Sequence, residues 1–263
     1  MAGRFYPNDA TALAAMIDSF VDPAPERMAA IGVVVPHAGY VYSGHVAGAI
    51  YSRVRTPSRN IILCPNHTGY GRPLSIMRSG SWQTPLGSLE IDSELCDALM
   101  AADPELENDI EAHRFEHAIE VQLPFLQASQ TGDGTRFVPI ALGVSDWNHL
   151  EQLGRAIAET IRRIDPSVLI IASSDMNHYE SDAVTRTKDA MAIDPMLKLD
   201  ARGLHETVRR RAISMCGAGP AAAMIVAAKI LGATRAELVK YATSAEVSKD
   251  FARVVGYAGV LVT

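Results

Sequence analysis

The stretch Ile31-Gly32-Val33-Val34-Val35-Pro36-His37 joins a continuous apolar run to a turn that carries a histidine. Apolar runs of this kind are typical of strands covered on both faces, as in parallel sheets. Two more segments, 61–63 and 168–171, have the same form, and each leads into a polar turn. The three segments together predict the parallel centre of an α/β sheet.

Polar turns with histidines follow all three runs. His37 comes after the first, His67 after the second, and Asp175 and His178 after the third. Ligands of open parallel sheets bind beyond the carboxyl ends of the strands. If these strands run parallel, the four side chains converge on one crevice. Histidines beside a carboxylate suit a metal site or proton transfer, whereas one histidine alone is more often a turn residue bonded to backbone.

Strand and helix patterns alternate along the rest of the chain. Further strands are expected at 137–142, 237–241 and 254–262, with a small antiparallel excursion from the main sheet between residues 74 and 91. Helices are expected at 8–20, 44–53, 93–101, 116–129, 146–164, 181–192, 204–211 and 217–232. The alternation predicts an α/β fold with a mostly parallel central sheet flanked by helices. No repeat, linker or boundary interrupts it, so we expect residues 1–263 to form a single domain.

The composition of the chain limits the classes of binding partner and the cellular compartment that we expect. The chain of 263 residues has a formal net charge of -6, which argues against nucleic acid and anionic membranes because both require a basic face. Three widely spaced cysteines exclude a disulfide framework and a four-thiolate zinc site. The most apolar stretch, 220–231, is too short to cross a bilayer and is expected to be a buried helix. No secretory signal opens the chain, so we expect a cytoplasmic protein with reduced thiols.

Cys216 is the cysteine with a chemical context, because it comes just before the predicted helix 217–232. A helix N-terminus lowers the pKa of a thiol and favours the thiolate, the form that binds metals. A buried structural cysteine is the competing interpretation. Cys64, at the end of a strand, and Cys96, on an amphipathic helix, are interpreted as packing residues.

His117 and Glu120 lie three residues apart in the predicted helix 116–129 and therefore share one face. They form either an intrahelical ion pair or a support behind the ligands of the site. Tyr40 either supplies a hydroxyl group there or forms part of the pocket wall. The remaining histidines have no comparable context and are expected at the surface: His45, His113, His149 and His205.

Taken together, these segments resemble the Memo family, which includes the B component of the AmmeMemoRadiSam system. The matching motifs are PHAGY with YSG, PNH, EH with QLPF, SSD with a following histidine, and CG with a following proline, within 36–44, 65–67, 116–125, 173–178 and 216–220. They span nearly the whole chain in the family's order. The family is similar in fold to class III extradiol ring-cleaving dioxygenases, whose α/β core holds a non-haem iron.

The resemblance implies roles for the residues at the strand ends. It implies metal ligation by His37, His67 and Cys216, with Cys216 standing where the dioxygenases have a glutamate. His178 matches their acid–base histidine, and Asp175 lines the same pocket. Members of the family have been linked to iron and copper. Two imidazoles and a thiolate are softer than two histidines and a carboxylate, so zinc is a further possible metal.

Two functions follow from the sequence and the resemblance. The first is metal-dependent redox activity on an unidentified small substrate, with His178 moving a proton and Asp175 fixing its tautomer or hydrogen-bonding to the bound species. The alternative is a non-catalytic module that binds a peptide or a partner protein in a vestigial pocket. A metal-dependent hydrolase is a third class, disfavoured because the chain has no HExxH or paired-aspartate motif. The resemblance also implies a functional link to radical-SAM and AMMECR-like proteins.

Overall fold

The computed structural model describes residues 1–23, 26–129 and 134–263. Within them the chain forms an 11-stranded mixed sheet in the order β10-β11-β1-β8-β2-β7-β3-β6, with β4, β5 and β9 attached beside this path. The strands are β1 Gly32–Val35, β2 Arg59–Pro65, β3 Leu74–Ile76, β4 Ser81–Thr84, β5 Gly87–Ile91, β6 Glu107–Asn108, β7 Arg136–Leu142, β8 Leu169–Ser173, β9 His178–Glu180, β10 Ala236–Thr243 and β11 Val254–Val262.

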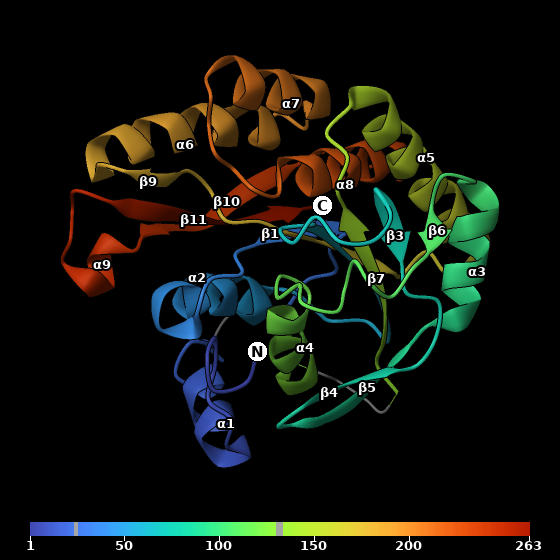
Figure 1. The fold of residues 1–263 in the computed structure, drawn as a ribbon, viewed down its shortest axis with the longest axis horizontal. Coiled ribbons are helices and arrows are strands. Elements are labelled where there is room, and N and C mark those ends of the chain that lie inside the picture. The colour runs from blue at the N-terminus through green and yellow to red at the C-terminus, as the bar shows by residue number, and fades with distance from the viewer. Residues whose placement is uncertain (24–25, 130–133) are drawn as a thin grey trace.

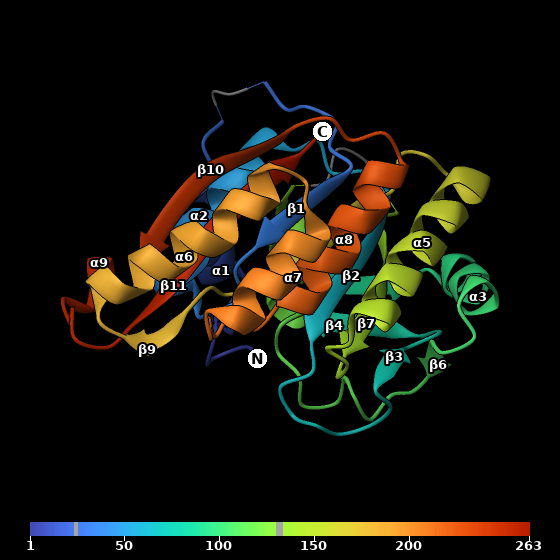
Figure 2. The ribbon, with the colours of Figure 1, turned by 90° about the horizontal axis from the view of Figure 1, so that it is seen from above.

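Helices cover both faces of this sheet. Figures 1 and 2 show α5 to α8 on one face and α1, α2 and α4 on the other. The helices are α1 Ala10–Asp18, α2 Tyr40–Arg53, α3 Ser93–Ala102, α4 Leu123–Ala128, α5 Trp147–Ile164, α6 Asp182–Leu197, α7 Ala201–Arg210, α8 Ala218–Ile230 and α9 Ala245–Ser248. The predicted α/β fold is therefore confirmed. Among the residues described, no helix combines the length and the apolar character needed to span a membrane.

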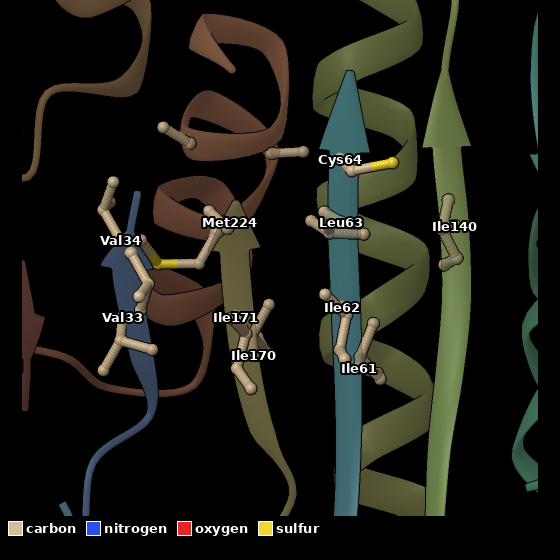
Figure 3. Packing of buried hydrophobic residues seen from close by; sticks show 14 of the residues in the cluster. Val33, Val34, Ile61, Ile62, Leu63, Cys64, Ile140, Ile170, Ile171 and Met224 are labelled. Carbon is tan, nitrogen blue, oxygen red and sulfur yellow. The ribbon is translucent and has the colours of Figure 1, made fainter. Parts of the chain in front are cut away.

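The four central strands, β1, β8, β2 and β7, all run parallel. Most of their side chains are apolar and buried, and those of Ile61, Ile170 and Val33 are fully enclosed. Figure 3 shows these rows side by side, with Met224 of α8 lying over them. A Cβ at Gly32 would lie 2.5 Å from the Met224 sulfur, so the glycine allows α8 to pack closely. The parallel arrangement that the crevice requires is present.

The flanks of the sheet contain antiparallel pairs, and the hairpin predicted between residues 74 and 91 lies elsewhere than expected. β11 runs antiparallel to both β1 and β10, and β3 runs antiparallel to β7. β4 and β5 form the antiparallel hairpin expected between residues 74 and 91. However, β5 also pairs with the start of β7, so the hairpin belongs to the main sheet rather than to a separate excursion.

The predicted helix 116–129 is wrong in its first half. The chain forms turns up to Ile119, then a 3-10 turn at Glu120–Gln122, and only then α4. The Glu116 side chain accepts hydrogen bonds from the backbone N–H groups of His117 and Ala118. Those bonds hold the segment in a turn, because a side-chain acceptor competes with helical hydrogen bonding.

Candidate metal centre

Three side chains from distant parts of the sequence meet beyond the carboxyl ends of the parallel strands. His37 follows β1, His67 follows β2, and Cys216 precedes α8. One potential ligand atom from each lies within 4.8 Å of the other two. The Cys216 sulfur is 3.2 Å from His37 Nε2, and the two imidazole centroids are 5.2 Å apart. The structure therefore brings together the three residues that the sequence selected.

The orientation of His37 is fixed by a buried hydrogen-bond network. The Ser173 hydroxyl donates to the Ala118 carbonyl (2.6 Å) and accepts from Gln122 Nε2 (3.0 Å). Its single proton is thus committed, so it accepts from Nδ1–H of His37 at 2.9 Å. Burial lowers the pKa of His37 to about 4, which keeps the ring neutral near pH 7. His37 Nε2 therefore presents a lone pair to Cys216.

His67 is oriented by a carboxylate that the sequence analysis did not single out. Its Nδ1 lies 3.0 Å from Oε1 of Glu116, and its backbone N–H donates to Oε2 at 2.7 Å. Burial acts to lower the pKa of His67, but the hydrogen bond and charge of Glu116 outweigh it and the pKa rises. A neutral His67 thus keeps its proton on Nδ1 and leaves Nε2 free. Carboxylates commonly orient metal-binding histidines in this way.

The same carboxylate also holds His117. Glu116 Oε1 lies 3.2 Å from His117 Nδ1, and the His117 ring is stacked between Phe5 (4.5 Å) and His67 (4.9 Å). Potential ligand atoms of His67, Glu116 and His117 also lie within 4.8 Å of one another. Burial would raise the pKa of Glu116, but hydrogen bonds from both histidines hold it well below its ordinary value. His117 thus supports the site through Glu116 and not through a helical pairing with Glu120.

The pKa of the Cys216 thiol differs from the sequence-based expectation. Burial, with a contribution from Asp175, raises the pKa of the thiol far above its ordinary value. The expectation that the start of α8 lowers this pKa is therefore wrong, because desolvation outweighs the helix. A protonated Cys216 has two acceptors for its single proton, His37 Nε2 at 3.2 Å and the Asp175 carbonyl at 3.6 Å. A metal cation would displace that proton, as thiolate ligation requires.

Asp175 contacts the proposed ligand His37, whereas His178 is bonded to Ser214, two residues before Cys216. Asp175 is 5% exposed, and its Oδ1 accepts from the backbone N–H of His37 at 2.8 Å. The Nδ1 of His178 donates to the carbonyl of Ser214 (2.9 Å), whose hydroxyl accepts from the backbone N–H of His178. The Ser214 carbonyl, rather than Asp175, thus fixes the tautomer of His178. A neutral His178 therefore carries an unprotonated Nε2 that suits a general base.

Glu120 and Tyr40 lie behind the site. Glu120 Oε1 accepts from the Tyr6 hydroxyl and from the amino group of Met1, both at 2.7 Å. The Tyr40 hydroxyl donates to the Val121 carbonyl at 2.7 Å, and its ring is buried in the core. Tyr40 therefore forms part of the wall, and its hydroxyl is committed to backbone.

Two histidines expected at the surface are buried. His113 is 5% exposed and His205 is 6% exposed. The ring of His113 faces Trp82, and that of His205 faces Trp147 and bonds to the Ser145 carbonyl. These contacts join residues far apart in sequence, which local patterns do not reveal.

The donor set fits a single transition-metal ion. His37 and His67 each have Nδ1 hydrogen-bonded from behind, which leaves the Nε2 lone pair of each neutral ring free to bind a metal. One potential ligand atom of each lies within 4.8 Å of the other and of the Cys216 sulfur. Two imidazoles and one thiolate suit iron, copper and zinc, and leave further coordination positions for substrate.

Comparison with solved structures supports the fold class. The crystal structure of an uncharacterized protein from Escherichia coli K12 covers 88% of this chain and 99% of its own, with a TM-score of 0.54 and 14% sequence identity. At that identity the match shows the fold alone, an α/β fold with a mixed sheet flanked by helices.

Sequence comparison then gives the family. The family model described as Memo-like protein matches residues 1–261. A MEMO1 family protein of Methanopyrus kandleri is 43% identical over 274 residues, covering 99% of this chain and 96% of the relative. Another, of Methanosarcina acetivorans, is 40% identical over 263 residues, covering 100% and 97%. The chain belongs to the Memo family, and the resemblance found in its motifs is confirmed.

Proposed function

We propose that the crevice binds one metal ion through His37, His67 and Cys216 and supports redox chemistry on a small substrate. The observation that carries this proposal is the 4.8 Å convergence of three ligand atoms, with both imidazoles oriented from behind. Iron or copper is the proposed metal, with zinc as the alternative. When bound, iron or copper would supply electron transfer, whereas zinc, which has no redox chemistry, would supply only a positive charge that polarises substrate oxygen atoms.

The residues around the ligands have separable tasks. Glu116 and Ser173 keep the protons of His67 and His37 on Nδ1, away from the crevice. His178 accepts a substrate proton at Nε2, while the Ser214 carbonyl stabilises the resulting imidazolium through Nδ1–H. Asp175 fixes the turn that carries His37 and adds negative charge beside it.

Metal reconstitution tests the proposal. The protein is loaded anaerobically with Fe(II), copper or zinc, and bound metal is measured for wild type, Cys216→Ser and Cys96→Ser. Cys96 is buried on α3, so its variant controls for the loss of a thiol elsewhere. We expect Cys216→Ser to bind at least tenfold more weakly and Cys96→Ser to bind as wild type does. Full stoichiometry and affinity in Cys216→Ser would show that Cys216 is not a ligand.

A second candidate is peptide or protein binding without turnover. Three aromatic side chains next to site residues are well exposed, at 59% for Tyr70, 61% for Phe115 and 66% for Tyr179. Tyr70 and Phe115 lie with ring centroids 6.2 Å apart, and exposed aromatic side chains are typical of recognition surfaces. Peptide affinity that is independent of metal and unchanged in His37→Ala would favour this function over redox chemistry.

A further inference from the structure

Tyr257, on β11, is a buried tyrosine whose hydroxyl group has no partner among the described residues. The residue is 2% exposed, and its hydroxyl makes no hydrogen bond within the part of the chain that the structure describes. Most buried polar groups do have a partner. The other described tyrosines that are buried or half-buried all donate a hydrogen bond: Tyr6 to Glu120, Tyr40 to the Val121 carbonyl, Tyr51 to Gln122 and Tyr241 to Asp189. The hydroxyl of Tyr257 is therefore available to a ligand.

The Tyr257 hydroxyl can also be reached from outside. Unpaired atoms such as Thr160 Oγ1 and Asn60 Oδ1 are shut off from solvent by the surrounding protein, so no ligand can reach them. The Tyr257 oxygen is not shut off in this way, although the rest of its side chain is buried. A buried ring that presents its hydroxyl to an open space is well placed to bind a ligand, because little side-chain freedom is lost on binding.

The register of the sheet places Tyr257 beside the turn that carries His37. β11 runs antiparallel to β1, with Val260 opposite Val34. The same register, continued by three residues along each chain, brings Tyr257 level with His37. The candidate metal centre lies at this level, because His37 is one of its three proposed ligands.

The alternation of side chains along β11 determines which way Tyr257 points. Neighbouring strand residues face opposite sides of a sheet. Gly256 faces α6, since a Cβ there would meet the side chain of Asp189. Tyr257 therefore faces the side covered by α2. On that side it belongs to a small apolar cluster with Val46 of α2 and with Ala38, the residue directly after His37.

The charge of Asp175 acts on both Tyr257 and the candidate metal centre. Asp175 Oδ2 lies 4.0 Å from His37 Nε2. Burial raises the pKa of Tyr257 well above its ordinary value, and the negative charge of Asp175 adds to this increase, as do Tyr42 and Tyr179. The hydroxyl therefore keeps its proton at neutral pH and acts as a hydrogen-bond donor. A donor in this position suits a ligand atom that accepts hydrogen bonds, such as an oxygen.

We infer that the Tyr257 hydroxyl donates a hydrogen bond to an oxygen atom of the substrate while that substrate is bound at the candidate metal centre. This role rests on the proposed function, because the metal makes the first contact with the substrate and Tyr257 makes a second. The substrate class is then a small molecule with an acceptor oxygen, such as a carboxylate or a carbonyl group. Tyr257 selects such molecules over metal-binding ligands that offer no acceptor, since those leave its hydroxyl unpaired.

The test uses protein loaded with Co(II), whose visible absorption reports changes in its ligands, and two probe ligands. Acetohydroxamate binds metals through oxygen atoms that accept hydrogen bonds, whereas imidazole binds through nitrogen and offers no further acceptor. Tyr257→Phe removes only the hydroxyl group. Tyr51→Phe is the matched control, because Tyr51 is a buried tyrosine of α2 whose ring stacks on Phe125. The affinity for Co(II) itself is measured first on each protein.

We expect Tyr257→Phe to bind Co(II) as tightly as wild type does, because the hydroxyl is not a metal ligand. Acetohydroxamate should bind about tenfold more weakly to loaded Tyr257→Phe, because a hydrogen bond to a charged acceptor is lost. Imidazole should bind equally to both proteins, and Tyr51→Phe should match wild type with both probes. The midpoint of thermal unfolding should not fall in Tyr257→Phe, since its hydroxyl has no partner among the described residues.

Equal acetohydroxamate affinity in Tyr257→Phe and wild type would overturn this role and would mean that the hydroxyl binds only water. An equal loss of affinity for both probes would overturn it too, because a general change of shape would then be the cause. So would an unfolding midpoint below that of Tyr51→Phe, which would indicate a bond within the protein. Absence of Co(II) binding by wild type would instead overturn the proposed function, and this role with it. Metal binding and probe binding are measured separately, so the two failures are distinguishable.

Discussion

Replacing Glu116 with glutamine is a sharp test of how the site is held together. The carboxylate accepts from the backbone N–H groups of His67 (2.7 Å), His117 (2.8 Å) and Ala118 (2.9 Å), and from the Nδ1 atoms of both histidines. It is 2% exposed, so water cannot replace a lost acceptor. Glu116→Gln keeps the shape but exchanges one acceptor oxygen for an NH₂ donor.

The expected loss follows from these bonds. If the glutamine oxygen takes the Oε1 position, it keeps the bonds from His117, Ala118 and His67 Nδ1–H, and its NH₂ group faces the backbone N–H of His67 and lies 3.1 Å from Nδ1. Hydrogen bonds to a charged group contribute about 1.5–3 kcal/mol each, so losing one and weakening the others reduces the free energy of unfolding by roughly 2–4 kcal/mol. The NH₂ group also favours a proton on Nε2 of His67, which weakens metal binding by about 10–100-fold.

Urea unfolding at pH 7, followed by tryptophan fluorescence, measures the loss of stability. Imidazole ¹⁵N shifts report which nitrogen of His67 carries the proton. Glu111→Gln is the control, because Glu111 is exposed and its contact with Arg114 is long, at 3.6 Å. We expect that control to change stability by less than about 0.5 kcal/mol. A loss below about 1 kcal/mol in Glu116→Gln, with Nδ1–H retained on His67, would refute the reasoning.

Two further predictions concern acid stability and packing. Burial lowers the pKa of His113 to about 4, so the unfolded chain takes up this proton first and stability is lost as pH falls from about 6.5 toward 4. We expect His113→Leu to remove roughly 2–3 kcal/mol of that loss. Urea unfolding at pH 7.5 and at pH 4.5 measures it, with wild type and His149→Leu as the comparisons. A pH dependence of stability in His113→Leu equal to that of wild type would contradict the prediction. Gly217→Ala would place a Cβ 2.4 Å from the Ser174 side chain, so we expect thermal unfolding to show a loss of stability of roughly 1–3 kcal/mol. In Gly219→Ala the nearest atom to the new Cβ is a Leu150 methyl carbon at 3.2 Å, so this variant should lose little stability. Equal stability of the two alanine variants would mean that the turn before α8 tolerates the added methyl group.

The centre of the fold was predictable because burial on both faces leaves continuous apolar runs. The runs at 31–35, 61–63 and 168–171 became β1, β2 and β8, with boundary differences of one or two residues. Their direction was an assumption, and their parallel pairing brings His37 and His67 to the same end of the sheet. Strands buried on both faces, and the turns that follow them, are thus the parts of this structure that the sequence predicts best.

The residues that orient the candidate site's histidines by hydrogen bonds could not be predicted in the same way. Glu116 was quoted in a family motif, but the apolar spacing that follows it predicted a helix and paired His117 with Glu120 instead. The real pairing depends on an irregular turn, and neither helical nor strand periodicity describes such a turn. Ser214 and Gln122 likewise act through tertiary hydrogen bonds. One signal was present: Glu116 is a carboxylate directly beside a histidine of the motif.

The position of β11 has a consequence for how the protein is made. β11 follows every other strand of the described sheet in the chain, yet it lies inside the sheet, between β10 and β1. Until residue 262 has left the ribosome, the backbone of β1 has an unpaired edge along its length. An apolar strand with an open edge is prone to pair with other chains. We therefore expect the edge of β1 to stay exposed to such pairing until β11 has been translated and has paired with it.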